Sequence, residues 1–290
     1  MEKIEIIIGK TAGFCYGVKR AVDGAKNELK KNNRLYGLGE IVHNQQVIQE
    51  LENLGMKFVE NIESAKGRAI IRAHGVPKEV YEKAKKRDIE LIDYTCENVL
   101  KIHRIADEYS KKGFYIFLLG TKKHPEILGI ISHCGKNNSI IEGENDILNA
   151  INNFKKSNIK KLLVIAQTTY NLQKFDKMKK IIQDELSNTS EIVFENTICK
   201  ATQMRQTETE NIAKKVNYMI IIGGKNSSNT KKLYDIAKKN CKNAICIETE
   251  EEVNLTNLKG IKKVGVMAGA STPPESIQKI IKKLRKIDIS

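Results

Sequence analysis

The feature that most constrains the fold of this 290-residue chain is its repeated alternation of short apolar runs with amphipathic stretches. The segment after Cys15 has the 3.6-residue apolar period of an amphipathic helix. Strand–loop–helix units of this length predict an α/β fold with mostly parallel sheets. The runs with strand character are KIEIIIG, AIIRA, IELIDY, FYIFLLG, KLLVIAQ, EIVFE, YMIIIGG and KVGVMAG.

The loops that follow these runs hold most of the unusual residues of the chain. In open α/β sheets, ligands bind at the carboxyl ends of the strands, so this concentration predicts a functional site. In the last loop, Thr272-Pro273-Pro274-Glu275 has the spacing of a capping box, with a proline at the first helical position. The loops are GFCYG, VHNQ, AHGVP, YTCEN, GTKKHPE, QTTYN, NTICKAT, GGKNSSN and AGASTPPE.

Three cysteines occupy similar places in the chain. Cys15, Cys96 and Cys199 each follow an apolar run and precede a helical pattern, at separations of 81 and 103 residues. This spacing predicts three comparable α/β modules, each directing one thiol to a common centre. We place the domains at residues 1–96, 97–193 and 194–290, with the C-terminal segment packing back on the first domain.

The chemistry of these three thiols points to a metal centre. A helix N-terminus lowers the pKa of a thiol and favours the thiolate that ligates metal. Soft thiolates select zinc or an iron–sulfur cluster, and structural zinc normally uses locally paired ligands, which this sequence lacks. A cluster held by three distant cysteines leaves one iron open to substrate. Cys241 and Cys246 flank a helix-to-strand passage and are predicted to be small buried hydrophobes.

The other polar loops predict an anion site. His43, His74 and His124 lie in loops after strands, where a protonated imidazole can donate to phosphate. The segments GGKNSSNTKKL and AGASTPPE add hydroxyls, an amide and helix-start N–H groups, without the ending of a P-loop. Together they favour a phosphate or diphosphate pocket over helix capping alone. His103 lies in a helical pattern and is expected in a surface or core role, and no role is assigned to His133 or Cys134.

Glu126 is the candidate proton donor. It follows His124 and a proline that fixes the turn, and its alternative role is that of a first-turn acid that interacts with the helix dipole. In a site with an electron source and a leaving hydroxyl, it would supply the proton. The hydroxyls of the Gln167-Thr168-Thr169 segment are placed to orient that carboxylate or a substrate alcohol.

The net charge of +15 comes mostly from lysines spread along helix-like segments. The chain has no tryptophan and no signature of a known nucleic-acid module, so an anionic substrate or an acidic protein partner is favoured over nucleic acid. No apolar run reaches the roughly 18 residues of a membrane span, and the first residues lack the basic region of a signal peptide. We therefore expect a soluble, cytoplasmic protein with reduced thiols.

With these motifs in view, the chain resembles the LytB family of 4-hydroxy-3-methylbut-2-enyl diphosphate reductases. The matching motifs occur in the family's order from residue 13 to residue 275 and cover essentially the whole chain. One departure lies around Cys96, where the family usually has Ala-Thr-Cys-Pro and this chain has Tyr94-Thr95-Cys96-Glu97. The motifs are GFCYGVKRA, VHN, AHGV, TC, HPEILG, QTT, TICKATQMRQ, NSSN and AGASTP.

The resemblance implies a trefoil of three small α/β domains around a central [4Fe–4S] cluster, one per chain, with Cys15, Cys96 and Cys199 as ligands. It also implies that Glu126, with His124 and Thr168, handles the proton and the substrate hydroxyl. Tyr94 is expected to alter the packing beneath the site, and Glu97 to lower the cluster potential. The residues implied to hold the diphosphate are His43, His74, Ser227, Ser228, Asn229 and Ser271.

The activity implied by the resemblance is the last step of the non-mevalonate isoprenoid pathway. Two electrons and two protons remove the hydroxyl of the allylic diphosphate as water, which gives isopentenyl and dimethylallyl diphosphate. The electrons would come from ferredoxin or flavodoxin, acidic proteins that suit a basic surface.

Two other classes of function remain open on the chemistry of the residues alone. A redox-silent hydro-lyase that uses an open iron as Lewis acid explains the thiols and Glu126 equally well, and an electron requirement would separate it from a reductase. A basic nucleic-acid-binding protein with a structural metal would instead show salt-sensitive binding to unrelated nucleic acids.

Overall fold

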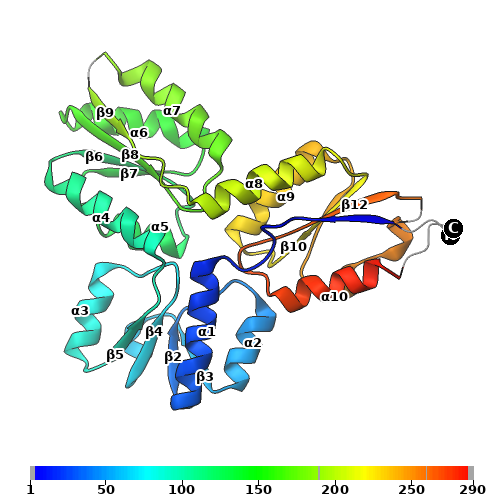
Figure 1. Ribbon diagram of the computed structural model, residues 1–290. Coiled ribbons are helices and arrows are strands. Elements are labelled where there is room, and N and C mark those ends of the chain that lie inside the picture. The colour runs from blue at the N-terminus through cyan, green and yellow to red at the C-terminus, as the bar shows by residue number, and fades with distance from the viewer. Residues whose placement is uncertain (1–3, 189, 259, 287–290) are drawn as a thin grey trace. The chain divides into compact units, whose positions relative to one another are not determined.

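The computed structural model describes residues 4–188, 190–258 and 260–286, which form three parallel four-stranded sheets (Figure 1). In spatial order, one sheet contains β3 (Met56–Val59), β2 (Leu35–Leu38), β4 (Arg68–Ile71) and β5 (Glu90–Asp93). The next contains β7 (Asn138–Ile141), β6 (Tyr115–Leu119), β8 (Lys161–Ala166) and β9 (Glu191–Phe194). The last contains β11 (Ala244–Ile247), β10 (Tyr218–Ile222), β12 (Lys263–Ala268) and β1 (Glu5–Ile8).

The three sheets share one topology. If the strands of each sheet are numbered along the chain, with β1 counted as the fourth strand of its sheet, their spatial order is 2-1-3-4 in all three. The fourth strand therefore lies at an edge. In the last sheet this edge position is taken by β1, whose Glu5 and Ile8 pair with Lys263 and Val266 of β12. The predicted α/β class with parallel sheets is therefore confirmed.

The chain forms two compact units. The terminal unit comprises residues 1–23, 42–54 and 200–290, and the central unit comprises residues 24–41 and 55–199. The fourth strands β5 and β9 end at Asp93 and Phe194, close to the domain boundaries expected from the sequence, whereas residues 5–8 join the C-terminal sheet. Those boundaries stay a prediction, and their outer ends, residues 1–3 and 287–290, lie outside the described residues.

In the central unit the sheet of β6 is covered on both faces. All five residues of β6 are buried, as in parallel sheets with helices on either side. Helices α6 (Glu144–Lys156) and α7 (Leu172–Leu186) pack on one face, and α4 (Glu97–Lys111) and α5 (Pro125–Ile131) pack on the other (Figure 1). The sheet of β4 is accompanied by α3 (Lys78–Lys86) and the short helix η1 (Ile62–Ser64).

In the terminal unit the sheet of β10 has the same layered arrangement. Helices α8 (Lys200–Ala213) and α9 (Ser228–Asn240) cover one face, and α10 (Pro274–Leu284) covers the other. The short helices η2 (Glu250–Glu252) and η3 (Leu255–Leu258) precede β12. The two remaining helices are α1 (Tyr16–Lys31) and α2 (Gln45–Asn53).

Most of the local predictions are confirmed. Each of the eight predicted runs overlaps a strand, and α1 buries the apolar positions expected of it: Val18, Ala21, Val22, Ala25 and Leu29. The predicted capping box at residues 272–275 is wrong. Helix α10 begins at Pro274 with Pro273 as its N-cap, and the hydroxyl of Thr272 donates to the carbonyl of Ile222 at 2.9 Å instead. The proline at the first helical position is confirmed.

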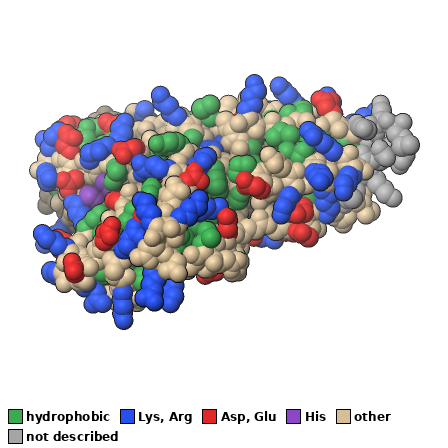
Figure 2. All heavy atoms as spheres, turned by 60° about the horizontal axis from the view of Figure 1, so that its bottom comes forward, with side chains coloured by type: hydrophobic (Ala, Val, Ile, Leu, Met, Phe, Trp, Pro, Cys, Tyr) green, Lys and Arg blue, Asp and Glu red, His purple; other side chains and the backbone are tan. Residues whose placement is uncertain are grey.

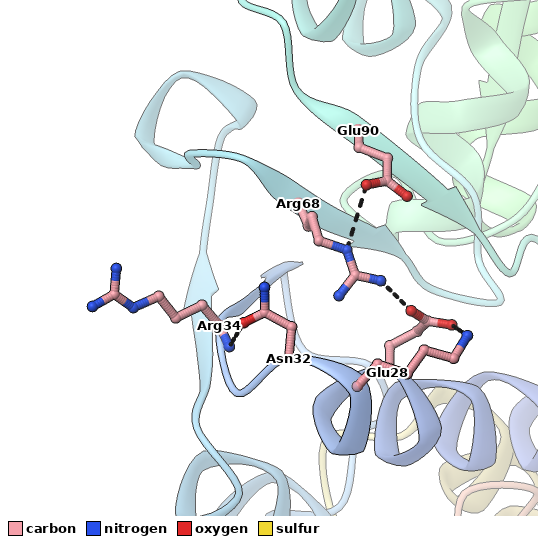
Figure 3. Close-up of polar contacts among 6 residues, drawn as sticks. Glu28, Asn32, Arg34, Arg68 and Glu90 are labelled. Carbon is pink, nitrogen blue, oxygen red and sulfur yellow. Dashed lines mark hydrogen bonds and ion pairs between the residues drawn. The ribbon is translucent and has the colours of Figure 1, made fainter.

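An ion-pair network joins the second half of α1 to the sheet of β4 within the central unit. Arg68 of β4 pairs with Glu28 of α1 and, at 3.4 Å, with Glu90 of β5, and Lys31 also pairs with Glu28 at 2.7 Å (Figure 3). The pKa of Glu28 is lowered, mainly by the hydrogen bond from Lys31. Burial raises this pKa, and the hydrogen bond from Arg68 lowers it further. Arg68 and Glu28 are largely shielded from solvent, so this pair adds to the attachment of α1.

The lysine-rich surface is mixed in charge. On the face shown in Figure 2, Lys and Arg side chains are interspersed with Asp and Glu. Several exposed lysines pair with an acid one turn back in the helix that they follow, as Lys112 does with Glu108 and Lys214 with Glu210. This is the pattern expected of solvated helix faces. Among the described residues, no helix is both long and apolar enough to span a membrane.

Candidate functional site

The central unit holds a buried carboxylate next to a threonine. Glu126, in the first turn of α5, is 1% exposed. The backbone N–H of Thr168 donates to its Oε1 at 2.6 Å, and the Thr168 hydroxyl lies 2.7 Å from its Oε2. Thr168 follows β8, the neighbour of β6, so the two side chains meet at the carboxyl ends of adjacent strands. Strand order reverses between these strands, which is where α/β sheets bind ligands.

Two further residues fix this pair. His124 is the N-cap of α5, and its Nδ1 accepts the backbone N–H of Glu126 at 3.1 Å. Gln167 is fully buried; its Oε1 accepts the N–H of Thr121 at 3.2 Å, and its Nε2 donates to the hydroxyl of Thr169 at 3.0 Å. The sequence predicted roles for His124 and Thr168 but none for the side chain of Gln167.

His74 and Cys96 lie in the same unit. The rings of His74 and His124 meet edge to face, with centroids 5.1 Å apart. Cys96 is the N-cap of α4, and its N–H donates to the carbonyl of Ala73, the residue before His74, at 3.0 Å. The amide of Asn98 lies 3.9 Å from its sulfur. The central unit therefore brings together His74, His124, Glu126 and Thr168, with Cys96 bonded beside His74.

The three candidate ligand cysteines occupy equivalent positions in the three sheets. Each cysteine follows the fourth strand of its sheet and precedes a helix. The backbone N–H of each cysteine donates to the carbonyl of the residue two positions past the end of the third strand. The acceptor carbonyls belong to Ala270 for Cys15, Ala73 for Cys96 and Thr168 for Cys199, at 3.2, 3.0 and 3.1 Å. All three cysteines are partly exposed at a helix start, which suits thiolate ligands of a soft metal centre.

The other cysteines differ from these three. The thiol of Cys134 lies 3.4 Å from the carbonyl of Ile130, and burial raises its pKa to about 12. Cys241 is also buried, with backbone carbonyls near its sulfur, as predicted for a small hydrophobe. Cys246 was also predicted to be buried but is only half-buried, and partial burial together with the charge of Glu248 raises its pKa to about 11. The thiols of Cys134 and Cys246 therefore keep their protons near neutral pH.

The terminal unit gathers most of the polar residues expected to bind an anion. Ser227 is the N-cap of α9, and its hydroxyl accepts the N–H of Thr230 at 3.3 Å. Asn229 is 4% exposed, and its Nδ2 has no hydrogen-bond partner among the described residues. A buried donor without a partner is costly and marks a place where a ligand acceptor fits. The hydroxyl of Ser228 lies 3.0 Å from Nζ of Lys232.

Two further loops, those of His43 and Ser271, lie close to these polar residues because glycines leave room for them. A Cβ on Gly224 would lie 2.3 Å from the carbonyl oxygen of His43, so only glycine allows the His43 loop to approach. A Cβ on Gly269 would lie 3.6 Å from Nδ2 of Asn229, which places the loop of Ser271 next to it. The cradle thus comprises His43, Ser227, Ser228, Asn229 and Ser271.

His103 and His133, outside these groups, form a stacked pair with centroids 4.3 Å apart. His103 is buried, so the core role considered for it is confirmed. Burial and the neighbouring His133 lower the pKa of His103 to about 4, and burial and Lys78 lower that of His133 to about 4.

Around Cys96 the structure explains how the unusual Tyr94 is accommodated. A Cβ on Gly24 of α1 would lie 2.1 to 2.4 Å from atoms of the Tyr94 side chain, so the glycine provides the space for the ring. Glu97 is exposed in the first turn of α4, where it suits the helix dipole.

The chain is similar to several known proteins. A family model described as LytB protein matches residues 6–285. A protein of Caldanaerobacter subterraneus subsp. tengcongensis, named 4-hydroxy-3-methylbut-2-enyl diphosphate reductase, is 41% identical over 98% of this chain and 98% of its own. A protein of Clostridioides difficile with the same name is 39% identical over 96% of this chain and 98% of its own.

Two solved structures are also similar. The reductase of Plasmodium falciparum is 30% identical with a TM-score of 0.87, over 98% of this chain and 88% of that one. A second structure, described as (E)-4-hydroxy-3-methyl-but-2-enyl diphosphate reductase, the terminal enzyme of the non-mevalonate pathway, is 37% identical with a TM-score of 0.71, over 98% of this chain and 100% of that one. The family model and these full-length relatives show that the chain belongs to the LytB family.

Proposed function

We propose that this protein is a 4-hydroxy-3-methylbut-2-enyl diphosphate reductase. It removes the hydroxyl of its allylic substrate as water with two electrons and two protons, and forms isopentenyl and dimethylallyl diphosphate. The observation that carries the proposal is the equivalent placement of Cys15, Cys96 and Cys199 in three sheets of one topology. Membership of the LytB family supports an allylic diphosphate as the substrate and the need for an electron donor.

A [4Fe–4S] cluster, one per chain, is the cofactor that fits this donor set. Cys15, Cys96 and Cys199 would hold it, leaving one iron without a protein thiolate. When bound, it supplies the electrons and an open coordination position. The contrast with Cys134 and Cys246, whose thiols remain protonated, supports this choice of ligands.

The diphosphate is held by His43, His74, Ser227, Ser228, Asn229 and Ser271. The Nδ2 of Asn229 finds no partner in the part of the chain that the structure describes, so it is the donor that most needs an acceptor, and the diphosphate oxygens supply one. Serine hydroxyls and the start of α9 add donors without adding positive charge.

We assign the proton to Glu126, and the hydrogen bonds of its carboxylate favour one of the two oxygens as the carrier. The N–H of Thr168 can only donate, so Oε1 of Glu126 must remain an acceptor. The hydroxyl of Thr168 can donate or accept, so Oε2 can carry a proton and donate it to this hydroxyl. Thr168 then donates its own proton toward the substrate oxygen, while His124 fixes the backbone of Glu126.

The electron donor is an acidic ferredoxin or flavodoxin, which the net charge of +15 favours electrostatically. The reaction requires no nucleic acid and no membrane, and we place the enzyme in the cytoplasm.

The test is anaerobic purification, followed by iron and sulfide analysis and by turnover with a chemical reductant. We expect four irons and four sulfides per chain, because the proposed cluster contains four of each. Serine at Cys15, Cys96 or Cys199 should abolish or cripple cluster retention, whereas serine at Cys241 or Cys246 should leave it near wild type. If all five variants behaved alike, the ligand assignment would be wrong.

A further inference from the structure

Helix α8 begins immediately after Cys199 and has an unusual buried face. A helix against a sheet normally buries an apolar stripe. The buried face of α8 instead includes four polar or charged side chains, and buried polar groups need hydrogen-bond partners. These side chains are Thr202, Arg205, Gln206 and Thr209.

Arg205 bonds to the backbone on two sides. It is 5% exposed, its Nη2 donates to the carbonyl of Gly13 at 2.7 Å, and its Nη1 donates to the carbonyl of Ala201 at 3.2 Å. Gly13 lies two residues before Cys15, and Ala201 lies two residues after Cys199. The rigid fork of a guanidinium can bridge two carbonyls in this way, whereas a lysine ammonium has no such geometry.

Glu208, one turn further along α8, accepts hydrogen bonds from the segment that precedes Cys15. It lies three residues after Arg205 and so on the same side of the helix. Its Oε1 accepts the N–H of Lys10 at 2.7 Å, and its Oε2 accepts the N–H and hydroxyl of Thr11 at 2.9 and 2.5 Å. Burial raises the pKa of Glu208, but the bonds from Thr11 and Lys10 outweigh it and the pKa is lowered. The carboxylate therefore stays ionised.

The loop comes close to the helix because Gly9 has no side chain. A Cβ there would lie 3.3 Å from Oε2 of Glu208 and 1.8 Å from the sulfur of Met267. The N–H of Cys15 in turn donates to the carbonyl of Ala270. Residues 10–15 are thus bonded at Lys10, Thr11, Gly13 and Cys15.

We propose that Arg205 and Glu208 form a clasp that positions the Cys15 loop on α8 and thereby presets Cys15 to hold the cluster. The clasp is the pair of side chains together with their bonds to Lys10, Thr11, Gly13 and Ala201. Both are positioning residues, because they act through the backbone around Cys15. The role in cluster binding rests on the proposed function, whereas the order of the loop does not.

The test compares Arg205→Met and Glu208→Gln with two control variants, Lys214→Met and Glu210→Gln. Each control removes the same charge as its partner variant, from a surface ion pair between Glu210 of α8 and Lys214 just after the helix. Thr11→Val is a milder variant that removes one hydroxyl bond to Glu208 and keeps the backbone N–H.

The first measurement is amide hydrogen exchange in the cluster-free protein. We expect exchange at Lys10 and Thr11 to rise about ten-fold or more in Glu208→Gln, as for the loss of charge-assisted bonds, and less in Thr11→Val. The amides of β10 should not change, which separates a loosened loop from global unfolding. Unchanged exchange at Lys10 and Thr11 would overturn the clasp whether or not the protein binds a cluster.

The second measurement is the rate of iron loss to a chelator under anaerobic conditions. The clasp variants should lose iron about ten-fold faster or more, with the controls at the wild-type rate, and Arg205→Lys should not restore the rate. Wild-type iron-loss rates in Arg205→Met and Glu208→Gln would overturn the role in cluster binding. Wild-type protein without iron or sulfide would instead overturn the proposed function and leave the exchange result to decide on the loop.

Discussion

Thr168 contacts both carboxylate oxygens of Glu126, with its backbone N–H at 2.6 Å and its hydroxyl at 2.7 Å. The two residues are 42 positions apart in the chain and meet because β6 and β8 are adjacent. The backbone N–H of Thr168 can only donate, so Oε1 of Glu126 must accept. The hydroxyl of Thr168 can donate or accept, so Oε2 of Glu126 is the oxygen that can carry a proton.

Glu126→Gln should lower turnover by about 10²-fold or more, because it removes the transferable proton and keeps the shape of the side chain. Substrate affinity and the cluster spectrum should change little, since a proton donor acts mainly in the transition state. Thr168→Val should also lower turnover, and Thr168→Ser, which keeps the hydroxyl, should recover most of it. The check is the steady-state rate with dithionite, together with a substrate titration of the cluster spectrum. A near-normal rate in Glu126→Gln would leave this residue as a helix-start acid.

Asn229→Ala should weaken diphosphate binding by about 1.5–3 kcal/mol, the worth of a hydrogen bond to a charged group. Ser227→Ala and His74→Ala should weaken it in the same direction. The corresponding alcohol without the diphosphate is the control ligand, because its binding should not respond to these changes. Calorimetry with both ligands provides the measurement. If the variants preferred diphosphate over alcohol as strongly as wild type does, the anion cradle would be misassigned.

Gly24→Ala should destabilise the protein by about 1–3 kcal/mol, because the added methyl meets the Tyr94 ring. Replacing Tyr94 with alanine in the same chain should recover part of this loss, since the two residues occupy one space. Denaturant unfolding of the two single variants and the double variant gives the coupling between them. Strictly additive losses would show that Tyr94 and Gly24 do not compete for this space.

The His103–His133 pair should make the protein less stable as the pH falls from about 6.5 to about 4. Both imidazoles have a pKa near 4 in the folded protein, against about 6.5 when unfolded. The unfolded state therefore binds more protons across this range, and the stabilisation present above about pH 6.5 is lost as pH falls. Carboxylates with lowered pKa values, such as Asp107 near 2, lose theirs only at lower pH.

Melting temperatures across this pH range provide the test of the histidine pair. His103→Leu should flatten the slope between pH 6.5 and 4.5, because it removes one titrating group from the stacked pair. Glu108→Gln, an exposed change on the same helix, should keep the wild-type slope. A wild-type slope in His103→Leu would refute the assignment.

The class of the fold follows from local patterns, but the membership of the sheets does not. Continuous apolar runs reveal most of the central strands, such as the isoleucines of β10, but the central strand β2 was not among the predicted runs. Edge strands β3 and β7 have only four residues each and include polar side chains, so they carry little signal. The pairing of β1 with β12 joins the two ends of the chain, and periodicity within a segment contains no information about such a partner.

The residue types of the candidate site are recognisable from the motifs, whereas their contacts are not. The Thr168 hydroxyl was expected to orient either the carboxylate of Glu126 or a substrate alcohol, yet which oxygen meets which donor depends on backbone geometry. Arg205 and Glu208 gave no signal of their task, because both bind backbone atoms almost 200 residues away. Backbone acceptors and donors are the same for every residue type, so a sequence does not mark them.

The measurement that tests the account most directly is the number of electrons consumed per substrate molecule. Anaerobic enzyme is mixed with a known amount of 4-hydroxy-3-methylbut-2-enyl diphosphate and excess reduced methyl viologen, and viologen oxidation and products are counted together. The account predicts two viologens oxidised for each substrate lost, with isopentenyl and dimethylallyl diphosphate as the products. Loss of substrate without viologen oxidation would contradict it and indicate a redox-silent hydro-lyase.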